Sequence, residues 1–389
     1  MYTQGEKKMN PIRRLRDFGQ SIWYDNIQRS MLGEGKELAR LIAEDDLRGI
    51  TSNPSIFEKA INGSSDYDAP LQHYLSSGPR PDSRALFFSL AIEDIQQAAD
   101  QLRPVYDASD AEDGYVSLEV SPDLAYDTEG TIAEAQQLAK RVNRPNLMIK
   151  VPATKEGLPA IEALTAAGIS INATLLFSVE RYEEVARAYL GGLRQRLEKG
   201  LPLDRIASVA SFFISRVDAA IDKQLHEKWA TANDLDKSII EKLTGHIAIA
   251  NAKLAYSLYQ QLYTQEFADL EAAGAQPQRL LWASTGVKDP SYSDVLYVDE
   301  LIGDHTVNTV PPATYQAFKD HGTPAASLGR GLEDAVTRLE QLEKLGIDLK
   351  AATLTLERDG VKTFEAAFNT LLASIDEKAD RLTQQKKSA

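Results

Sequence analysis

The sequence of 389 residues contains no cysteine. This absence excludes disulfide bonds, thiolate nucleophiles and every zinc or iron–sulfur site that depends on cysteine ligands. Histidine is also scarce, and its five occurrences show neither the HxH nor the HExxH spacing of histidine-based metal sites. We therefore expect no metal ion in this protein. The histidines are His73, His226, His246, His305 and His321.

Long apolar runs are missing as well. No segment approaches the ~18 consecutive apolar residues that a membrane-spanning helix requires. The first residues, MYTQGEKKMNPIRRLRDFG, are polar and lack the apolar stretch of a secretory signal. We expect no membrane association and a cytoplasmic location. We also expect residues from 1 to about 17 to form a disordered N-terminal extension, with Met9 as an alternative initiator to Met1.

Basic residues are fewer than acidic residues. The chain has 43 Lys and Arg residues against 57 Asp and Glu residues, which gives a formal net charge of −14. This balance argues against nucleic acid or an anionic membrane as a partner. It also repels phosphorylated metabolites at long range. A phosphorylated substrate would therefore need cations placed locally in its binding site.

Eight short segments rich in branched or aromatic residues predict β-strands, and most are separated by segments of helical periodicity. Strand–helix alternation predicts parallel strands joined by right-handed crossovers, and eight such strands close a barrel. The predicted fold class is thus α/β, a (β/α)₈ TIM barrel. The predicted strands are residues 22–27, 48–53, 115–120, 147–151, 170–177, 206–213, 280–285 and 305–310, and the clearest helices between them are 131–142, 158–167 and 180–197.

Two gaps between predicted strands are too long for one crossover helix. We expect a helix at residues 83–102 in the first gap and a long helix at 235–263 in the second. After the last strand, residues 328–345 and 362–382 predict two further helices that pack on the barrel, within a C-terminal region of about 328–385. No linker divides the chain, so residues 1–389 are interpreted as a single TIM-barrel domain.

Polar residues recur near the C-terminal ends of the predicted strands, where the active site of such a barrel lies. A polar side chain in an apolar strand is costly to bury unless something satisfies it. Its recurrence at one end of most strands indicates a shared polar cavity. The residues are Asp25, Asn53, Glu119, Lys150, Asn172, Thr174, Ser211 and Ser284.

Lys150 is the strongest candidate for a catalytic residue. Its neighbours Leu147, Ile149 and Val151 predict a buried strand, and lysine is almost never fully buried without a purpose. Burial disfavours the ammonium form and yields a neutral amine that can attack a ketone. The alternative is a strand-end lysine that reaches water or pairs with a carboxylate.

The other polar candidates each have a structural interpretation beside the functional one. Asp25 and Glu119 are either acid/base groups or ion-pair partners of a lysine. Asn53 precedes Pro54 and could simply cap a helix. Asn172 and Thr174 lie two residues apart and so share a strand face.

Two cations follow the sixth and seventh predicted strands. Arg216 lies near the start of a predicted helix, where its charge opposes the helix dipole, and Lys288 follows in the segment STGVKDP. Both placements suit a bound anion. Each residue could also be a solvated loop cation.

Several longer motifs together resemble the transaldolase family. The resemblance extends from about Asp17 to Ala373, and the chain length is similar to that of a longer bacterial subgroup. The motifs are GITSNPSIF (49–57), VSLEVSPDLAYDT (116–128), NLMIKVPATKEGL (146–158), GISINATLLFS (168–178), TGHIAIANAKLAY (244–256) and DGVKTFEAAF (359–368).

The resemblance implies a reaction that uses neither metal nor cofactor. A dihydroxyacetone unit would pass from sedoheptulose 7-phosphate to glyceraldehyde 3-phosphate, giving erythrose 4-phosphate and fructose 6-phosphate in the pentose phosphate pathway. By position in the motifs, Lys150 would form the Schiff base. Glu119 and Thr174 would hold a proton-shuttling water, and Asp25 would take the proton of the C4 hydroxyl.

The resemblance also implies the substrate-binding residues. Asn53, Asn172 and Ser211 would bind the dihydroxyacetone hydroxyls, Phe213 and Ser284 would line the pocket, and Arg216 would bind the phosphate. Shorter members of the family carry a second phosphate-binding arginine on the seventh strand, where this chain has Ser284-Thr285-Gly286-Val287-Lys288. We expect Lys288 to replace it as a point charge.

Three alternatives remain at this point. The nearest is a fructose 6-phosphate aldolase, which releases free dihydroxyacetone; the resemblance associates Glu119 and Phe213 with transfer instead. The second is a barrel that only binds sugar phosphates, and the third is a metal-dependent class II aldolase, which the few histidines disfavour. We expect either a monomer or a homodimer.

Overall fold

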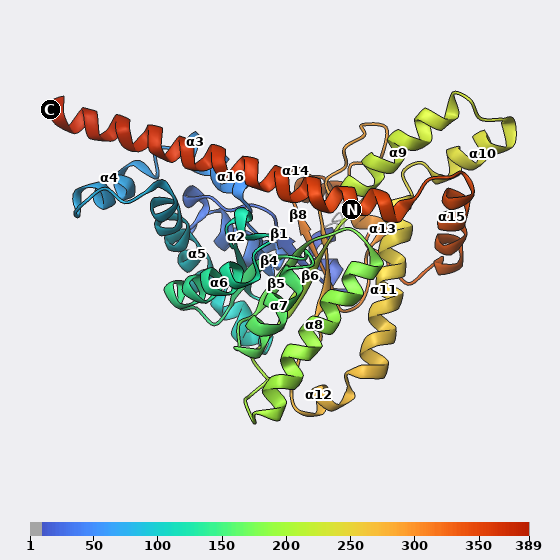
Figure 1. The fold of residues 1–389 in the computed structure, drawn as a ribbon, viewed down its shortest axis with the longest axis horizontal. Coiled ribbons are helices and arrows are strands. Elements are labelled where there is room, and N and C mark those ends of the chain that lie inside the picture. Colours follow the sequence, from blue (N-terminus) through green and yellow to red (C-terminus); the bar gives the residue numbers. More distant parts are fainter. Residues whose placement is uncertain (1–9, 389) are drawn as a thin grey trace, which may run out of the picture.

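A computed structural model describes residues 10–388, in which eight parallel strands form a closed barrel (Figure 1). Each strand pairs with its sequence neighbours, and β1 pairs with β8 to close the sheet. Every predicted strand segment contains one of these strands in whole or in part, so the predicted TIM barrel is confirmed. The strands are β1 (Gln20–Tyr24), β2 (Gly49–Ile50), β3 (Tyr115–Glu119), β4 (Leu147–Pro152), β5 (Ile171–Leu176), β6 (Ser208–Phe213), β7 (Arg279–Ala283) and β8 (Thr306–Val310).

Helices surround the barrel, as the right-handed crossovers require. The helices at 131–142, 158–167 and 180–197 were predicted to within three residues at each end. The helices between β1 and the end of the last crossover are α2 (Glu37–Asp45), α3 (Pro54–Gly63), α4 (Asp68–Ser76), α5 (Ser83–Ala108), α6 (Thr128–Val142), α7 (Gly157–Ala166), α8 (Val179–Glu198), α9 (Ser215–Trp229), α10 (Asp234–Leu243), α11 (Ile247–Glu266), α12 (Ala268–Ala272) and α13 (Leu296–Glu300), and α14 (Pro312–His321) follows β8.

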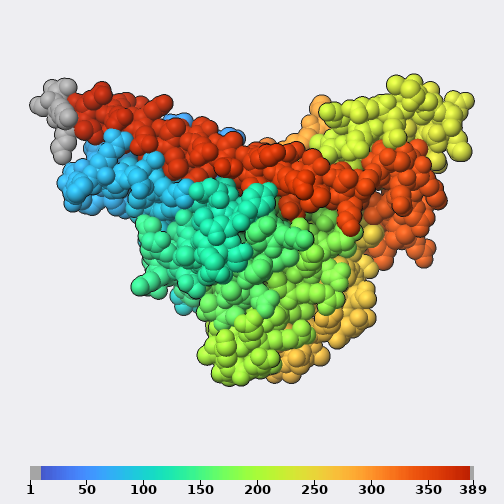
Figure 2. All heavy atoms as spheres, viewed as in Figure 1, coloured from blue at the N-terminus to red at the C-terminus, as the bar shows by residue number. Residues whose placement is uncertain are grey.

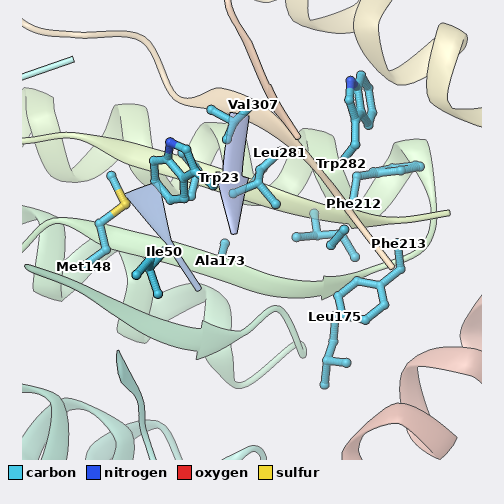
Figure 3. Packing of buried hydrophobic residues seen from close by; sticks show 14 of the residues in the cluster. Trp23, Ile50, Met148, Ala173, Leu175, Phe212, Phe213, Leu281, Trp282 and Val307 are labelled. Atoms are coloured by element: carbon cyan, nitrogen blue, oxygen red, sulfur yellow. The ribbon is translucent and has the colours of Figure 1, made fainter. Parts of the chain in front are cut away.

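The strands are buried along their whole length, because side chains fill the barrel and helices cover its outside. Figure 3 shows part of this packing, with Trp23, Met148 and Leu281 among the buried side chains. The short strand β2 passes directly against the indole of Trp23. A Cβ atom on Gly49 would lie 2.6 Å from that ring, so glycine is required at this crossing.

Two helix predictions were wrong in detail. The helix expected at 235–263 is two helices, because Gly245 adopts a left-handed conformation (φ 73°) between α10 and α11. The backbone N–H of Gly245 donates to Oδ1 of Asp222 at 3.0 Å, so this N–H keeps a hydrogen-bond partner where the helix is interrupted. The helix α5 continues past Pro104 to Ala108, although we expected it to end at Leu102. A proline there forfeits one backbone hydrogen bond, and the buried ring of Tyr106 anchors the last turn.

The two ends of the chain also differ from expectation. Residues 1–9 of the expected extension, including Met9, lie outside the described residues. Residues 11–18, however, form α1 (Pro11–Arg14) and a 3₁₀ turn (Leu15–Phe18), with Ile12 and Leu15 buried. At the other end, α15 (Leu332–Lys344) is followed by α16 (Leu349–Ser388), which begins well before the predicted residue 362.

Helix α16 runs along one edge of the molecule, and its residues form a continuous band in the space-filling view (Figures 1 and 2). It packs on α3, α4, α5 and α9 and on the end of β5. It therefore covers the barrel at the C-terminal ends of the strands. Among the described residues, no helix is both long and apolar enough to cross a membrane.

Candidate active site

A cavity of about 490 Å³ opens at the C-terminal ends of the barrel strands. The predicted site residues converge there from six strands and their following loops. Two further predicted residues, Glu119 and Asn172, lie buried among these side chains. The predicted residues that line the cavity are Asp25, Asn53, Lys150, Thr174, Ser211, Phe213, Arg216, Ser284 and Lys288.

The strand register explains why Lys150 has these neighbours. Glu119 on β3 pairs with Lys150 on β4, which pairs in turn with Asn172 on β5. Alternate residues of a strand point to one face, so the three side chains form a row across the barrel interior. Lys150 is 5% exposed, and its amine donates to the carbonyl oxygen of Ser52 at 3.0 Å and lies 3.5 Å from Oε2 of Glu119. It reaches the cavity and is in contact with one carboxylate.

Burial raises the pKa of Glu119, and the nearby Lys150 ammonium opposes that shift. Neither oxygen of Glu119 makes a hydrogen bond within residues 10–388, and the same holds for Oγ1 of Thr174. Buried polar atoms without a protein partner can bind a water or a ligand. The pair can therefore hold a small polar molecule beside the amine and exchange protons with it.

Asp25 lies on the other side of the cavity, just after β1. Its Oδ1 accepts a hydrogen bond from Oγ1 of Thr51 at 2.7 Å, and Thr51 is 2.6 Å from Oγ1 of Thr309. Burial raises the pKa of Asp25, while Lys150 opposes the shift. A carboxylate in this setting can take a proton from a substrate hydroxyl. Thr51 and Thr309 were not predicted as site residues. Thr51 could have been found, because it lies two residues before Asn53 in a predicted strand and therefore shares its face.

The amide of Asn172 is fixed between two serines. Its Nδ2 donates to Oγ of Ser117 at 3.1 Å, and Oγ of Ser211 donates to its Oδ1 at 2.6 Å. Ser117 was missed, although it alternates with Glu119 on β3 and so had to share its face. The three side chains form a hydrogen-bonded row, and Ser211 lines the cavity.

Asn53 caps helix α3, and its Oδ1 accepts a hydrogen bond from the N–H of Ile56 at 3.0 Å. The capping interpretation is thus confirmed. The side chain also lines the cavity, and its Nδ2 makes no hydrogen bond with the described part of the chain. Capping through the oxygen leaves the nitrogen free to donate to a ligand.

Arg216 is the second residue of α9 and lies between two phenyl rings. Its guanidinium carbon is 5.1 Å from the ring centre of Phe213 and 5.7 Å from that of Phe364. Burial lowers the pKa of Arg216, and the carboxylates of Asp25 and Glu119 act in the opposite direction. No carboxylate within residues 10–388 forms an ion pair with it, so its charge is available to an anion.

Three further residues complete the rim. Lys288 is exposed and makes no ion pair within the described chain, and the same is true of Lys59 on α3, which sequence analysis missed. Ser284 has a left-handed backbone (φ 55°), and its carbonyl accepts from the N–H of Ser215 at 3.0 Å. Backbone strain at a residue other than glycine is often found at functional sites.

The arrangement combines a buried amine, two carboxyl groups with raised pKa, hydroxyl and amide donors, and unpaired cations at the rim. Such a set suits covalent chemistry on the carbonyl group of a phosphorylated sugar.

The comparison with known protein families agrees with this site. Residues 22–375 match the family model described as transaldolase/fructose-6-phosphate aldolase. The chain belongs to this family.

Curated relatives named as transaldolases match almost the whole chain. The transaldolase of Thermobifida fusca is 47% identical over 378 residues, which cover 97% of this chain and 98% of the relative. Transaldolase 1 of Streptomyces avermitilis is 48% identical over 366 residues, with 94% of each chain covered. Transaldolase 2 of a Nostoc strain is 45% identical over 381 residues, covering 96% of this chain and 99% of the relative. The family resemblance inferred from the motifs is confirmed.

A second cavity of about 610 Å³ adjoins the transaldolase-family site and shares Lys288 with it. One face of α9 contributes Asp218 and Asp222 to this cavity. Oδ2 of Asp218 accepts from the hydroxyl of Tyr297 at 2.9 Å, and its Oδ1 accepts from the N–H of Ala248 at 2.6 Å. Burial, with a contribution from Asp222, raises the pKa of Asp218 to about 7. The helix that carries Arg216 is thus anchored through a carboxyl group that titrates near neutral pH.

This shift predicts a pH-dependent stability. Between pH 3.8, the ordinary pKa of an aspartate, and about pH 7, the unfolded chain has released a proton that folded Asp218 retains. The contribution of Asp218 to the free energy of unfolding therefore falls as pH rises through this window, by at most on the order of 4 kcal/mol. The neutral variant Asp218→Asn lacks this dependence. Its stability relative to the wild type should increase from about pH 4 to about pH 8 in denaturant titrations.

The matched control is Asp269→Asn, at an exposed position of α12. The difference in the free energy of unfolding between this variant and the wild type should be constant over the same pH range. Parallel curves for Asp218→Asn and the wild type would show that Asp218 titrates normally in the folded state.

Proposed function

We propose that this protein is a transaldolase that transfers a dihydroxyacetone unit from sedoheptulose 7-phosphate to glyceraldehyde 3-phosphate through a Schiff base on Lys150. The products would be erythrose 4-phosphate and fructose 6-phosphate, in the pentose phosphate pathway. The observation that carries the proposal is the buried Lys150 amine, which reaches the cavity 3.5 Å from Glu119. The family match and the names of the relatives support it.

The first half of the reaction forms the imine. The Lys150 amine attacks the C2 carbonyl of the ketose, and the carbinolamine that results loses water to give an iminium ion. A water held by Glu119 and Thr174 would carry the protons for both steps. Their buried oxygens, which make no hydrogen bond within residues 10–388, are suited to that water.

The second half breaks and remakes a carbon–carbon bond. Asp25 takes the proton of the C4 hydroxyl, the C3–C4 bond breaks, and its electron pair moves into the iminium group to form an enamine. The shortened aldose leaves. The enamine then adds to the acceptor aldehyde, Asp25 returns the proton to the new hydroxyl, and hydrolysis frees Lys150. Acid/base assistance of this kind is worth about 10²–10⁴-fold.

Substrate binding follows the same geometry. Asn53, Asn172 and Ser211 would bind the hydroxyls of the dihydroxyacetone unit, with Phe213 and Ser284 as walls. Arg216 would bind the phosphate, and Lys288 would add a point charge at the rim. Lys59 lies on the opposite side of the mouth, since α3 follows β2 and α9 follows β6.

The imine itself is the electron sink, so the proposed reaction includes neither a metal ion nor a cofactor. Within residues 10–388, no three His, Asp or Glu side chains form a group that could hold a metal ion. We retain three further sequence-based predictions as proposals: a single TIM-barrel domain over 1–389, a monomer or homodimer, and a cytoplasmic location.

The test against a plain aldolase omits the acceptor. With fructose 6-phosphate alone, a transaldolase should release about one equivalent of glyceraldehyde 3-phosphate per site and keep the dihydroxyacetone unit bound. Rapid-quench assays with coupled detection of both products measure this. Multiple-turnover release of free dihydroxyacetone would instead identify an aldolase, and no release of either product would identify a binding protein.

A further inference from the structure

Arg216 is held in a different way from the arginines of this protein that pair with carboxylates. Arg181 pairs with Glu357 at 3.0 Å, and Arg84 pairs with Asp123 at 2.7 Å. Arg216 makes no hydrogen bond or ion pair within residues 10–388, and the rings of Phe213 and Phe364 lie against its guanidinium. The two aromatic rings therefore supply its close contacts.

Aromatic contacts suit a residue that must bind an anion. A carboxylate partner would neutralise the guanidinium and compete with phosphate for its N–H donors. A ring face attracts the cation through its quadrupole and leaves those donors free. The two rings can thus fix the direction of Arg216 without weakening its affinity for phosphate.

The two rings come from different parts of the fold. Phe213 ends β6 and packs on Phe177, with ring centres 5.1 Å apart, so the barrel itself fixes it. Figure 3 shows Phe213 and Leu175 among the buried side chains of the core. Phe364 belongs to α16, the long C-terminal helix that covers this mouth. The contact of its ring with Arg216 therefore depends on how α16 packs on the barrel.

Two contacts seat α16 beside Phe364. A Cβ atom on Gly360, one turn earlier, would lie 3.0 Å from Cδ2 of Leu175, so the missing side chain allows the helix to approach β5 closely. A further turn back, Glu357 pairs with Arg181 of α8 and is 9% exposed. The helix is therefore held against the barrel where Phe364 meets Arg216.

We propose that Phe364 is a positioning residue, which holds Arg216 in the direction that binds the substrate phosphate. Through it, helix α16 determines how strongly the enzyme prefers phosphorylated over unphosphorylated sugars. The inference rests on the proposed function in assigning the phosphate to Arg216. It does not depend on the Schiff base.

The experiment measures binding by isothermal titration calorimetry for fructose 6-phosphate, inorganic phosphate and fructose. All proteins carry Lys150→Ala, so that the sugars bind without forming the imine. In Phe364→Leu, the Kd for the two phosphate-bearing ligands should rise about 3- to 10-fold, as the loss of a partly desolvated cation–π contact implies. The Kd for fructose should change less than about twofold. Phe364→Tyr keeps the ring face and should restore the phosphate affinity.

Phe368→Leu is the matched control. Phe368 lies one turn further along α16, is also buried and has the guanidinium of Arg84 5.5 Å from its ring centre, yet it does not line the cavity. Its loss should lower the melting temperature by an amount similar to that of Phe364→Leu, with the ratio of the Kd for fructose to that for fructose 6-phosphate unchanged.

Equal weakening of fructose and fructose 6-phosphate in Phe364→Leu would overturn the inference, because it would show a general packing role. Unchanged phosphate affinity in that variant would overturn it as well. The variant Arg216→Gln distinguishes a failure of the role of Phe364 from a failure of the assignment of the phosphate to Arg216. If it loses phosphate affinity while Phe364→Leu does not, only the role of Phe364 fails. If Arg216→Gln binds phosphate normally, the assignment of the phosphate to Arg216 fails too.

Discussion

Replacement of Lys150 by alanine should lower kcat by on the order of 10⁴-fold or more and leave the barrel folded. The amine is the nucleophile of the proposed reaction, and no other lysine lies within the row formed by β3, β4 and β5. Its removal leaves the buried carboxyl group of Glu119 without its nearest counter-charge. Because burial already raises the pKa of Glu119, that group can take up a proton, which limits the loss of stability.

The measurement pairs steady-state turnover with thermal unfolding followed by circular dichroism. Lys155→Ala is the matched control, since Lys155 is exposed in the loop after the same strand. It should keep full activity. If Lys150→Ala unfolds at the assay temperature, Lys150 acts mainly as a structural cation. If the variant retains turnover, the chemistry does not pass through this amine.

The substitution Asp25→Asn has the second largest expected effect. It should lower kcat by about 10²–10⁴-fold, because the C4 hydroxyl loses the group that takes its proton. Formation of the Schiff base does not involve Asp25 in the proposed sequence. Borohydride should therefore still trap the ketose on Lys150 in this variant, at a yield close to that of the wild type.

Asn can accept the hydrogen bond that Thr51 donates to Asp25 at 2.7 Å, so the local geometry should persist. Asp17→Asn, at an exposed position before β1, controls for the loss of one negative charge near this strand. Loss of both turnover and trapping in Asp25→Asn would place Asp25 in imine formation. Normal turnover would remove it from the mechanism.

The barrel could be predicted because its signals are local. Each strand is a short run of branched and aromatic residues, and parallel pairing follows from the helices between them. The side chains of Glu119, Lys150 and Asn172 could also be foreseen, since each polar residue stands near the end of an apolar strand. Adjacent parallel strands then bring them together.

The parts that could not be predicted depend on contacts between distant segments. Phe364 is an ordinary apolar residue of an amphipathic helix, and only the packing of α16 places it on Arg216. Thr309 joins Thr51 across the closure of the barrel, between β8 and the loop after β2. The break between α10 and α11 depends on Asp222, which receives the N–H of Gly245.

The position of Lys288 could be predicted from the sequence, but its role in binding could not. Its place after β7 predicted a position at the cavity, and the structure puts it on the rim. Whether it binds phosphate is a question of charge without fixed geometry, since its flexible stem ends in a point charge.

The proposed reaction requires Lys150 to condense with a ketose. The most direct test incubates the protein with fructose 6-phosphate, reduces it with borohydride and maps the modified peptide by mass spectrometry. We expect a stable adduct of the dihydroxyacetone unit or of the whole sugar on Lys150, absent when the ketose is left out. A protein that turns over substrate but carries no adduct on Lys150 would contradict it.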